Sequence, residues 1–407
     1  MSSKYDNVLD LISRDETVRF LQDILRIDSV IRPGKSTFEE EVAVFIADYL
    51  RKLGFETLVD EVEPHRPNVV SVLSGREKGR CLLFEGHSDV VTEGVGSKWT
   101  YPAFGGEIHN GRLYGRGACD TKGNVAAMIM AARAIKESGV EFKGKIKLCI
   151  PVDEEGLMIG IKDFIKKGHA DDIDAAIICE PEENNVCIKQ KGAMRAVIRI
   201  FGKQSHGCMP LTGINPIPKM AKLISHIMEL EAEEIGKRGK DPFLGYPSIT
   251  PTVVLAPSEA EPQVNVVPGE LKITIDIRTI CGQDHNYIEE RLTGLLKAME
   301  KEDKEFKATL EIIEQRPWTE TPAKHPIVRT VAKAYKDLTG RDATYNGVPG
   351  ATDGTFLKAW KGIEIVTTGA GNRELPHQYD EYVDIDELME TSRLYALSAL
   401  YYLNEEY

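Results

Sequence analysis

Short apolar runs alternate with helix-period segments over the two ends of the chain. Four runs are apolar on both faces, as strands covered by helices are, and they span residues 81–84, 145–152, 173–179 and 363–368. Residues 40–53 and 124–135 carry apolar side chains at helical spacing, and Gly54 follows the first of these segments where a helix C-cap is expected. The pattern predicts an α/β fold with a mostly parallel sheet covered by helices.

The middle of the chain follows a different pattern. Strands are predicted over residues 195–201, 249–255, 271–278 and 308–313, and helices over residues 218–234 and 284–301. This order is the β-α-β-β-α-β unit of an α+β, ferredoxin-like module. A module inserted over residues 192–315 splits the first domain into residues 1–191 and 316–407. The second of these segments ends in a predicted helix, which has a capping-box-like start at Asp384.

Side chains of the types that bind metal ions occur in several short segments. His87, Glu154, Glu155 and Glu180 each follow a predicted strand, Asp120 follows a glycine-rich turn, and His377 lies in the later segment 375–381. Because ligands collect at the carboxyl ends of the strands in open α/β sheets, we expect these residues to lie close together. Imidazole and carboxylate donors together suit a pair of divalent ions roughly 3.5–4 Å apart. A single histidine after a strand is more often a polar loop residue, but several such segments in order favour a metal centre.

These segments, with Gly86-His87-Ser88-Asp89 and Gly117-Ala118-Cys119-Asp120-Thr121 among them, resemble the M20 family of di-metal amidohydrolases and peptidases nearly end to end. Within that family the chain is similar to the branch of acetylornithine deacetylase and succinyl-diaminopimelate desuccinylase. The resemblance implies a phosphorylase/hydrolase-like catalytic domain that binds two divalent ions per subunit, zinc or else cobalt or manganese. It also implies a cis peptide bond between Asp120 and Thr121.

The resemblance also assigns a role to each candidate residue. Asp120 bridges the two ions, His87 and Glu180 complete one site, and Glu155 and His377 complete the other. Glu154 is then the general base, and Asp89 orients the imidazole of His87. For Glu154 and Glu155 the alternative interpretation is an acidic helix N-terminus.

In the resemblance the inserted module is a lid and dimerisation domain. His206 matches a histidine that reaches the active site of the partner subunit and polarises the scissile carbonyl. Asn265 and Arg278 match positions that contact the carboxylate or carbonyl of the substrate, and an arginine can grip a carboxylate bidentately. Gly350 and Thr352 lie in a segment that resembles the family's glycine-rich substrate loop. His206 could instead be a solvated loop residue, and Arg278 an exposed strand residue paired with a carboxylate.

Composition restricts the partners of this chain. The 51 basic and 64 acidic residues give a formal charge of −13, which disfavours nucleic acids and anionic membranes. No apolar run approaches the ~18 residues of a membrane span, and the first residues lack an apolar signal core, so we expect a cytoplasmic protein. Seven cysteines without C-x-x-C spacing indicate reduced thiols. A small molecule is the expected partner.

The ligands and the resemblance together predict a homodimeric hydrolase of N-acyl amino acids. Water shared by two such ions loses a proton near neutral pH, and Glu154 would accept it. In the family, a glutamate at the position of Glu180 tends to accompany deacylases and carboxypeptidases. The acyl group stays open, as do a metallocarboxypeptidase, a dipeptidase and a catalytically silent binding protein, although the presence of every ligand disfavours a silent relative.

Overall fold

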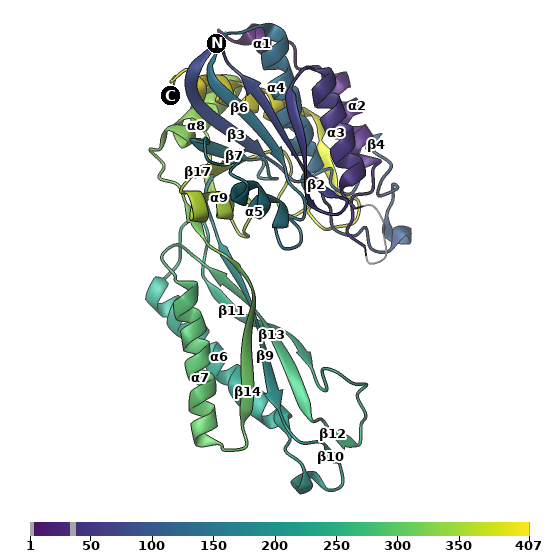
Figure 1. The fold of residues 1–407 in the computed structure, drawn as a ribbon, viewed down its shortest axis with the longest axis vertical. Helices are drawn as coiled ribbons and strands as arrows, with labels where there is room; N and C mark the ends of the chain where they lie inside the picture. The colour runs from purple at the N-terminus through teal and green to yellow at the C-terminus, as the bar shows by residue number, and fades with distance from the viewer. Residues whose placement is uncertain (1–3, 33–37, 407) are drawn as a thin grey trace. The chain divides into compact units, whose positions relative to one another are not determined.

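The computed structural model describes residues 4–32 and 38–406 of the 407-residue chain. The chain divides into two compact units. The large unit consists of residues 1–188, 321–347 and 352–407, and the inserted unit consists of residues 189–320 and 348–351. The large unit is therefore built from both ends of the sequence (Figure 1).

The large unit is built on one mixed sheet. Its strands lie in the order β1 (Glu56–Glu63), β2 (Arg66–Ser74), β6 (Lys143–Ile150), β3 (Glu77–Glu85), β7 (Ala175–Ile178), β17 (Glu364–Thr367) and β8 (Val186–Gln190). Strands β6, β3, β7 and β17 are parallel, whereas β1, β2 and β8 run antiparallel to their neighbours. The short strands β15 (Thr319–Glu320) and β16 (Tyr345–Val348) also pair with β8. The predicted parallel sheet is confirmed at its centre.

Helices cover both faces of this sheet. One face carries α4 (Lys122–Ser138) and α10 (Ile385–Leu403), beside which pack α1 (Asp6–Leu9), α2 (Arg14–Leu25), α3 (Glu40–Lys52) and α8 (Pro326–Thr339). The other face carries α5 (Ile159–Lys166) and α9 (Gly354–Lys361). Strand β3 faces both layers, because Leu83 packs with α5 and α9 while the ring of Phe84 lies 5.4 Å from that of Tyr395 on α10. Burial on both faces explains the continuous apolar runs.

The inserted unit is an antiparallel sheet with two helices on one face (Figure 1). The strand order is β11 (Ser248–Leu255), β13 (Glu270–Thr279), β9 (Gly192–Phe201) and β14 (Lys307–Arg316). Every second residue of β13, such as Ile273, Ile275 and Ile277, is buried against α6 (Pro216–Arg238) and α7 (His285–Glu302). The predicted ferredoxin-like order of elements is confirmed. Two short strands, β10 (Ser205–His206) and β12 (Val266–Val267), pair apart from this sheet, and the 3₁₀ turn η2 (Pro210–Thr212) follows β10.

A small sheet of the large unit adjoins the start of α10. Its strands are β18 (Tyr382–Asp384), β5 (Arg112–Tyr114) and β4 (Glu107–His109), and the 3₁₀ turn η1 (Gly96–Lys98) precedes β4 in the chain. The Asp384 side chain accepts hydrogen bonds from the backbone N–H groups of Asp386 and Glu387, which confirms the predicted helix start. Among the helices of residues 4–32 and 38–406, none has both the length and the apolar character to cross a membrane.

All seven cysteines lie within the described residues and are free thiols. Five are buried: Cys81, Cys119, Cys149, Cys179 and Cys187. Burial raises the pKa of the Cys81 thiol to about 12, which keeps it neutral and unreactive. The buried cysteines therefore act as small apolar side chains, as predicted.

Candidate metal centre

The candidate ligands gather at one edge of the central sheet. Strands β6, β3 and β7 are adjacent and parallel, and the segments that leave their carboxyl ends carry Glu154 and Glu155, His87, and Glu180, respectively. Asp120 lies just before α4, at the end of the glycine-rich turn. The Asp120–Thr121 peptide bond is cis, as the resemblance implied. Parallel strand direction therefore brings His87, Glu154, Glu155 and Glu180 to one edge of the sheet, whereas Asp120 and His377 come from other segments.

The Asp120 carboxylate lies between the two histidines. The Nε2 atom of His87 is 3.1 Å from Oδ1 of Asp120 and 3.5 Å from Oε1 of Glu180. The Nε2 atom of His377 is 3.6 Å from Oδ2 of Asp120 and 2.9 Å from Oε1 of Glu155. Potential ligand atoms of His87, Asp120 and Glu155 all lie within 4.8 Å of one another. Asp120 thus lies next to both histidines, with Glu180 beside His87 and Glu155 beside His377.

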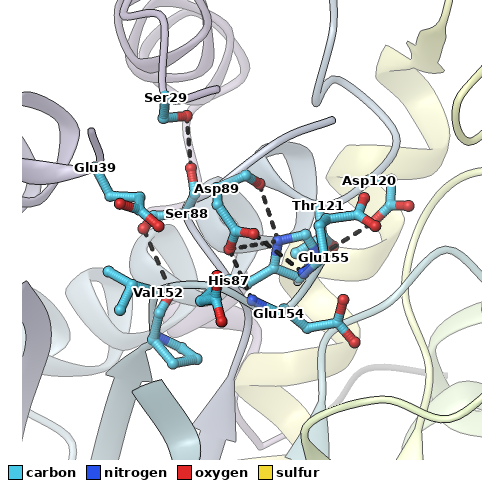
Figure 2. Close-up of polar contacts among 12 residues, drawn as sticks. Ser29, Glu39, His87, Ser88, Asp89, Asp120, Thr121, Val152, Glu154 and Glu155 are labelled. Carbon is cyan, nitrogen blue, oxygen red and sulfur yellow. Dashed lines mark hydrogen bonds and ion pairs between the residues drawn. The ribbon is translucent and has the colours of Figure 1, made fainter. Parts of the chain in front are cut away.

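Asp89 contacts His87 and the backbone of Glu154 and Glu155 (Figure 2). The Nδ1 atom of His87 is 3.0 Å from the backbone oxygen of Asp89 and 3.5 Å from its Oδ1. The same carboxylate accepts the backbone N–H groups of Glu154 on Oδ1 and of Glu155 on Oδ2, both at 3.1 Å. Asp89 is fully buried. The residue therefore orients one imidazole and also holds the backbone from which both glutamates project.

Glu381 supports Asp120 in a similar way, and sequence reasoning assigned it no role. One of its oxygens accepts the backbone N–H groups of Gly117, Cys119 and Asp120 at 3.0, 2.9 and 3.0 Å. Its other oxygen pairs with the guanidinium of Arg116, and both side chains are buried. The local sequence feature that connects Glu381 with the site is its position four residues after His377. Glu381 fixes the turn that presents Asp120.

The charges of this centre are strongly coupled. Burial alone would raise the pKa of Asp120, but hydrogen bonds with His377 and His87 hold it below its usual value. Burial would lower the pKa of His87, yet the charge of Glu180 and the hydrogen bond with Asp120 raise it well above 6.5. Burial and the charge of Asp120 raise the pKa of Glu155. Several buried carboxylates thus compete for few positive partners.

Glu85 adds a further buried carboxyl group close enough to His87, Glu154 and Asp89 to interact with their charges. It ends β3, is fully buried, and neither of its oxygens has a hydrogen-bond partner among the residues that the structure describes. Burial, with the charges of Glu154 and Asp89, raises its pKa to about 8 in spite of the opposing charge of His87. An excess of buried acidic groups around two imidazoles fits a site for divalent cations.

The remaining predicted residues belong to other segments. His206 lies on β10 and is exposed; its Nδ1 accepts the N–H of Cys208 at 3.1 Å. The N–H of Gly207 donates to the Asn265 carbonyl at 2.7 Å, so His206 and Asn265 lie on adjoining segments of the inserted unit. Arg278 binds Asp276 through two hydrogen bonds of 2.7 and 3.1 Å, the paired state that the sequence had left open.

The predicted substrate loop is divided between exposed and buried positions. Gly350 is partly exposed, and apart from Gly350 and its two chain neighbours no heavy atom of the described residues lies within 4 Å of where a Cβ would stand. Thr352 is buried, and its backbone oxygen accepts the N–H of Thr355 near the start of α9 at 2.9 Å. The loop therefore leads from an open position directly into a helix N-terminus of the large unit.

Buried carboxylates beside His87 at the ends of parallel strands, with His377 next to them, are typical of the site of a metal-dependent enzyme. The profile of peptidase family M20/M25/M40 matches residues 83–400. The chain belongs to this family. It is therefore a metal-dependent hydrolase that acts on amide bonds.

Relatives and solved structures match nearly the whole chain. A probable succinyl-diaminopimelate desuccinylase of Staphylococcus aureus is 26% identical over 415 residues, which cover 97% of this chain and 99% of the relative. Among solved structures, the dipeptidase Dug1p of Saccharomyces cerevisiae has a TM-score of 0.81 at 18% identity, with all of both chains covered. The metallo-carboxypeptidase Sso-CP2 of Sulfolobus solfataricus has a TM-score of 0.80 at 20% identity, with 95% of this chain and 99% of that one covered. At such identities the two structures establish the fold.

We expect the metal-free protein to lose stability as the pH rises from 6.5 to about 10. Hydrogen bonds with Asp120 and Glu155 raise the pKa of His377 from 6.5 to about 10. Between these two pH values the folded state holds a proton that the unfolded state has released. The contribution of His377 to stability is therefore complete below pH 6.5 and is lost as the pH passes the pKa of His377 in the folded state. Thermal unfolding of the chelator-treated protein across this range measures the slope. His377→Gln should flatten it, His226→Gln should not, and an unchanged slope in His377→Gln would contradict the expectation.

Glu381→Gln is expected to lower the free energy of unfolding by about 3–5 kcal/mol, because it leaves the buried Arg116 without its anionic partner. Metal affinity should fall with it, since the turn that presents Asp120 loses an acceptor charge. Urea unfolding measures the first effect. Glu141→Gln, which breaks the exposed ion pair with Arg76, is the control and should cost less than about 1 kcal/mol. Equal losses in the free energy of unfolding for the two variants would contradict the supporting role of Glu381.

Proposed function

We propose that this chain is a di-metal amidohydrolase that cleaves the amide bond of an N-acyl amino acid. The observation that carries the proposal is the placement of the Asp120 carboxylate between His87 and Glu180 on one side and His377 and Glu155 on the other. Mixed imidazole and carboxylate donors suit zinc, with cobalt or manganese as alternatives. Two such ions would polarise the amide carbonyl and activate the water that attacks it at neutral pH.

Glu154 is the proposed general base. It is buried, and its backbone is held by Asp89 while its side chain leads away from that carboxylate (Figure 2). Glu154 would take a proton from the attacking water and pass it to the nitrogen as the carbon–nitrogen bond breaks. The products are then a carboxylate and a free amine. The same residue serves twice, so its orientation matters in both steps.

The inserted unit would recognise the substrate. Its Arg278 and Asn265 offer a guanidinium and an amide for a substrate carboxylate, and the loop from Gly350 to Thr352, the latter in the large unit, leads to the N-terminus of α9. Asp276 accepts from Nε and Nη2 along one edge of the Arg278 guanidinium, so a substrate carboxylate would either displace Asp276 or bind at the Nη1 side. The relative named as a desuccinylase supports an N-acyl amino acid as substrate.

A peptide is the second candidate substrate. Both solved structures named above carry peptidase titles, one a dipeptidase and one a carboxypeptidase. A C-terminal peptide bond offers the same amide next to a carboxylate. The reaction and the proposed roles of Glu154 and the metal ligands are the same for both substrate classes, so only the acyl side differs.

The proposed assembly is a homodimer formed through the inserted unit. His206 is exposed, and the neighbouring Met209, Leu211 and Val264 expose 55%, 97% and 109% of their reference surface. On edge strand β11, Val253 and Val254 are also exposed. Exposed apolar side chains beside a polar donor support contact with another protein surface. In this proposal, His206 donates a hydrogen bond to the carbonyl oxygen of a substrate bound by the partner subunit.

The proposed function predicts hydrolysis that depends on added metal. Chelator-treated protein should cleave one class among N-acetyl, N-succinyl and N-formyl amino acids and C-terminal dipeptides only after zinc, cobalt or manganese is restored. Glu154→Gln is the matched control: it keeps the size of the side chain but cannot accept a proton, so two ions should bind while kcat falls at least about 100-fold. Substantial turnover by Glu154→Gln would contradict the role of Glu154. Two bound ions with no cleavage of any panel member would contradict the proposed activity.

Subunit complementation tests the role of His206. Mixing inactive His206→Gln with inactive Glu154→Gln should restore up to about a quarter of wild-type activity, because half of the dimers are mixed and each has one intact site of two. His226→Gln, a histidine on α6 without an assigned role, should lose no activity alone. If the mixture stays inactive although mixed dimers form, His206 does not act across subunits.

A further inference from the structure

The turn that carries Glu154 and Glu155 is closed on the residue before them. Asp153 has a φ of +66°, in the left-handed region that aspartate tolerates better than most residues. Its backbone oxygen accepts the N–H of Gly156 at 3.2 Å and of Met158 at 2.7 Å. Its carboxylate oxygen Oδ2 accepts the N–H of Leu157 at 2.8 Å and of Ile159 at 3.4 Å. The four backbone N–H groups of residues 156–159, which follow the two glutamates in the chain, therefore all donate to Asp153.

The fit around this carboxylate is tight. A Cβ atom at Gly156 would lie 2.4 Å from Oδ1 of Asp153, so only glycine leaves room for the carboxylate over the turn. Asp153 is buried. Both its backbone conformation and its side-chain position are thus set by the surrounding chain.

A buried arginine holds the other carboxylate oxygen. Nη2 of Arg66, the first residue of β2, is 2.6 Å from Oδ1 of Asp153. The same guanidinium binds Glu39 through Nε at 3.0 Å and Nη2 at 2.7 Å. Glu39 is fully buried just before α3. Burial would lower the pKa of Arg66, but hydrogen bonds with Glu39 and Asp153 raise it, so the guanidinium stays charged.

An ion pair that only stabilised the fold could lie anywhere in the large unit, but the pair of Arg66 and Asp153 lies at the turn that carries Glu154 and Glu155. The two N–H groups that Asp89 accepts belong to Glu154 and Glu155, and the residue that Arg66 holds directly precedes them. The segment is therefore fixed from two sides by two buried carboxylates. With both ends fixed, the side chains of Glu154 and Glu155 leave the backbone in set directions.

We propose that Asp153, held by Arg66 and Glu39, is a positioning residue that sets the directions of Glu154 and Glu155. The inference rests on the proposed function, in which Glu155 binds a metal ion and Glu154 moves the proton. Its consequence is a division of roles within Asp153-Glu154-Glu155: the first acidic residue shapes the turn, and the other two perform the chemistry.

Asp153→Asn and Asp153→Gly test this role in the full-length protein. Both residues tolerate the left-handed backbone, so neither adds strain at φ +66°. Asparagine keeps the shape but loses the charge, and glycine loses the side chain. With Co²⁺ as the probe, we expect an altered visible absorption spectrum and a metal affinity about 10- to 100-fold lower, as for other residues that orient metal ligands. At saturating metal, kcat should fall by a similar factor while KM stays unchanged.

The matched control is Asp172→Asn. Asp172 pairs with the buried Lys147 in the same unit but accepts no hydrogen bond from the turn of Glu154. Its loss should lower the melting temperature without changing the Co²⁺ spectrum or kcat. Should the Asp153 variants fold poorly, Arg66→Lys provides a second route, since it keeps the charge but loses the planar fork. Its effect should be smaller in the Asp153→Asn background than alone, because both changes break one connection.

The outcomes separate the inference from the proposed function. Asp153 variants with the wild-type spectrum, metal affinity and kcat would overturn the positioning role. Wild-type protein that binds Co²⁺ but cleaves no amide in the panel would overturn the proposed activity, while the spectrum of the variants would still decide the role of Asp153. Wild-type protein that binds no Co²⁺ would overturn both.

Discussion

The candidate metal centre depends first on the buried carboxylate of Asp89. Burial would raise its pKa, but the hydrogen bond and charge of His87 and the N–H groups of Glu155 and Glu154 lower it, so the group stays ionised. An ionised carboxylate without water must be satisfied by protein donors. Its partners are Nδ1 of His87, 3.5 Å from Oδ1, and the N–H groups of Glu154 and Glu155, and they come from the loops after β3 and β6 that carry the imidazole and both glutamates. One desolvated charge thereby fixes the relative positions of groups that the chemistry needs together.

The positions of the ligands could be predicted because strand direction is encoded locally. Runs that are apolar on both faces predict covered parallel strands, and parallel strands end at a common edge. His87, Glu154 and Glu180 each follow such a run, so their convergence needed no knowledge of distant contacts. The strand predicted over residues 271–278 is β13, in which Ile273, Ile275 and Ile277 are buried on one face. The local sequence was sufficient to predict a residue's position where that position is set by the direction of its own strand.

The supports of the site could not be predicted, because they join segments that are far apart in the sequence. Glu381 accepts the N–H of Gly117, which lies 264 residues earlier, and Arg66 meets Asp153 across 87 residues. Nothing near Arg66 distinguishes it from an exposed strand arginine, and the left-handed φ of Asp153 has no signature beyond a residue type that tolerates it. The antiparallel outer strands β1, β2 and β8 were missed for a related reason: their partners, not their composition, set their direction.

The excess of buried acid also explains why so much backbone bonding surrounds the site. An ion-pair network that served stability alone would match each carboxylate with a positive or hydrogen-bonding partner. Here burial raises the pKa of Glu180 well above its usual range, and the charges of Asp120 and Glu154 add to the rise despite the opposing charge of His87. Such a cluster repels itself, and the segments that carry it would separate unless other contacts held them. The bonds that Asp89, Glu381 and Asp153 make to main-chain N–H groups oppose that separation without neutralising the ligands, which leaves the negative charge available to cations.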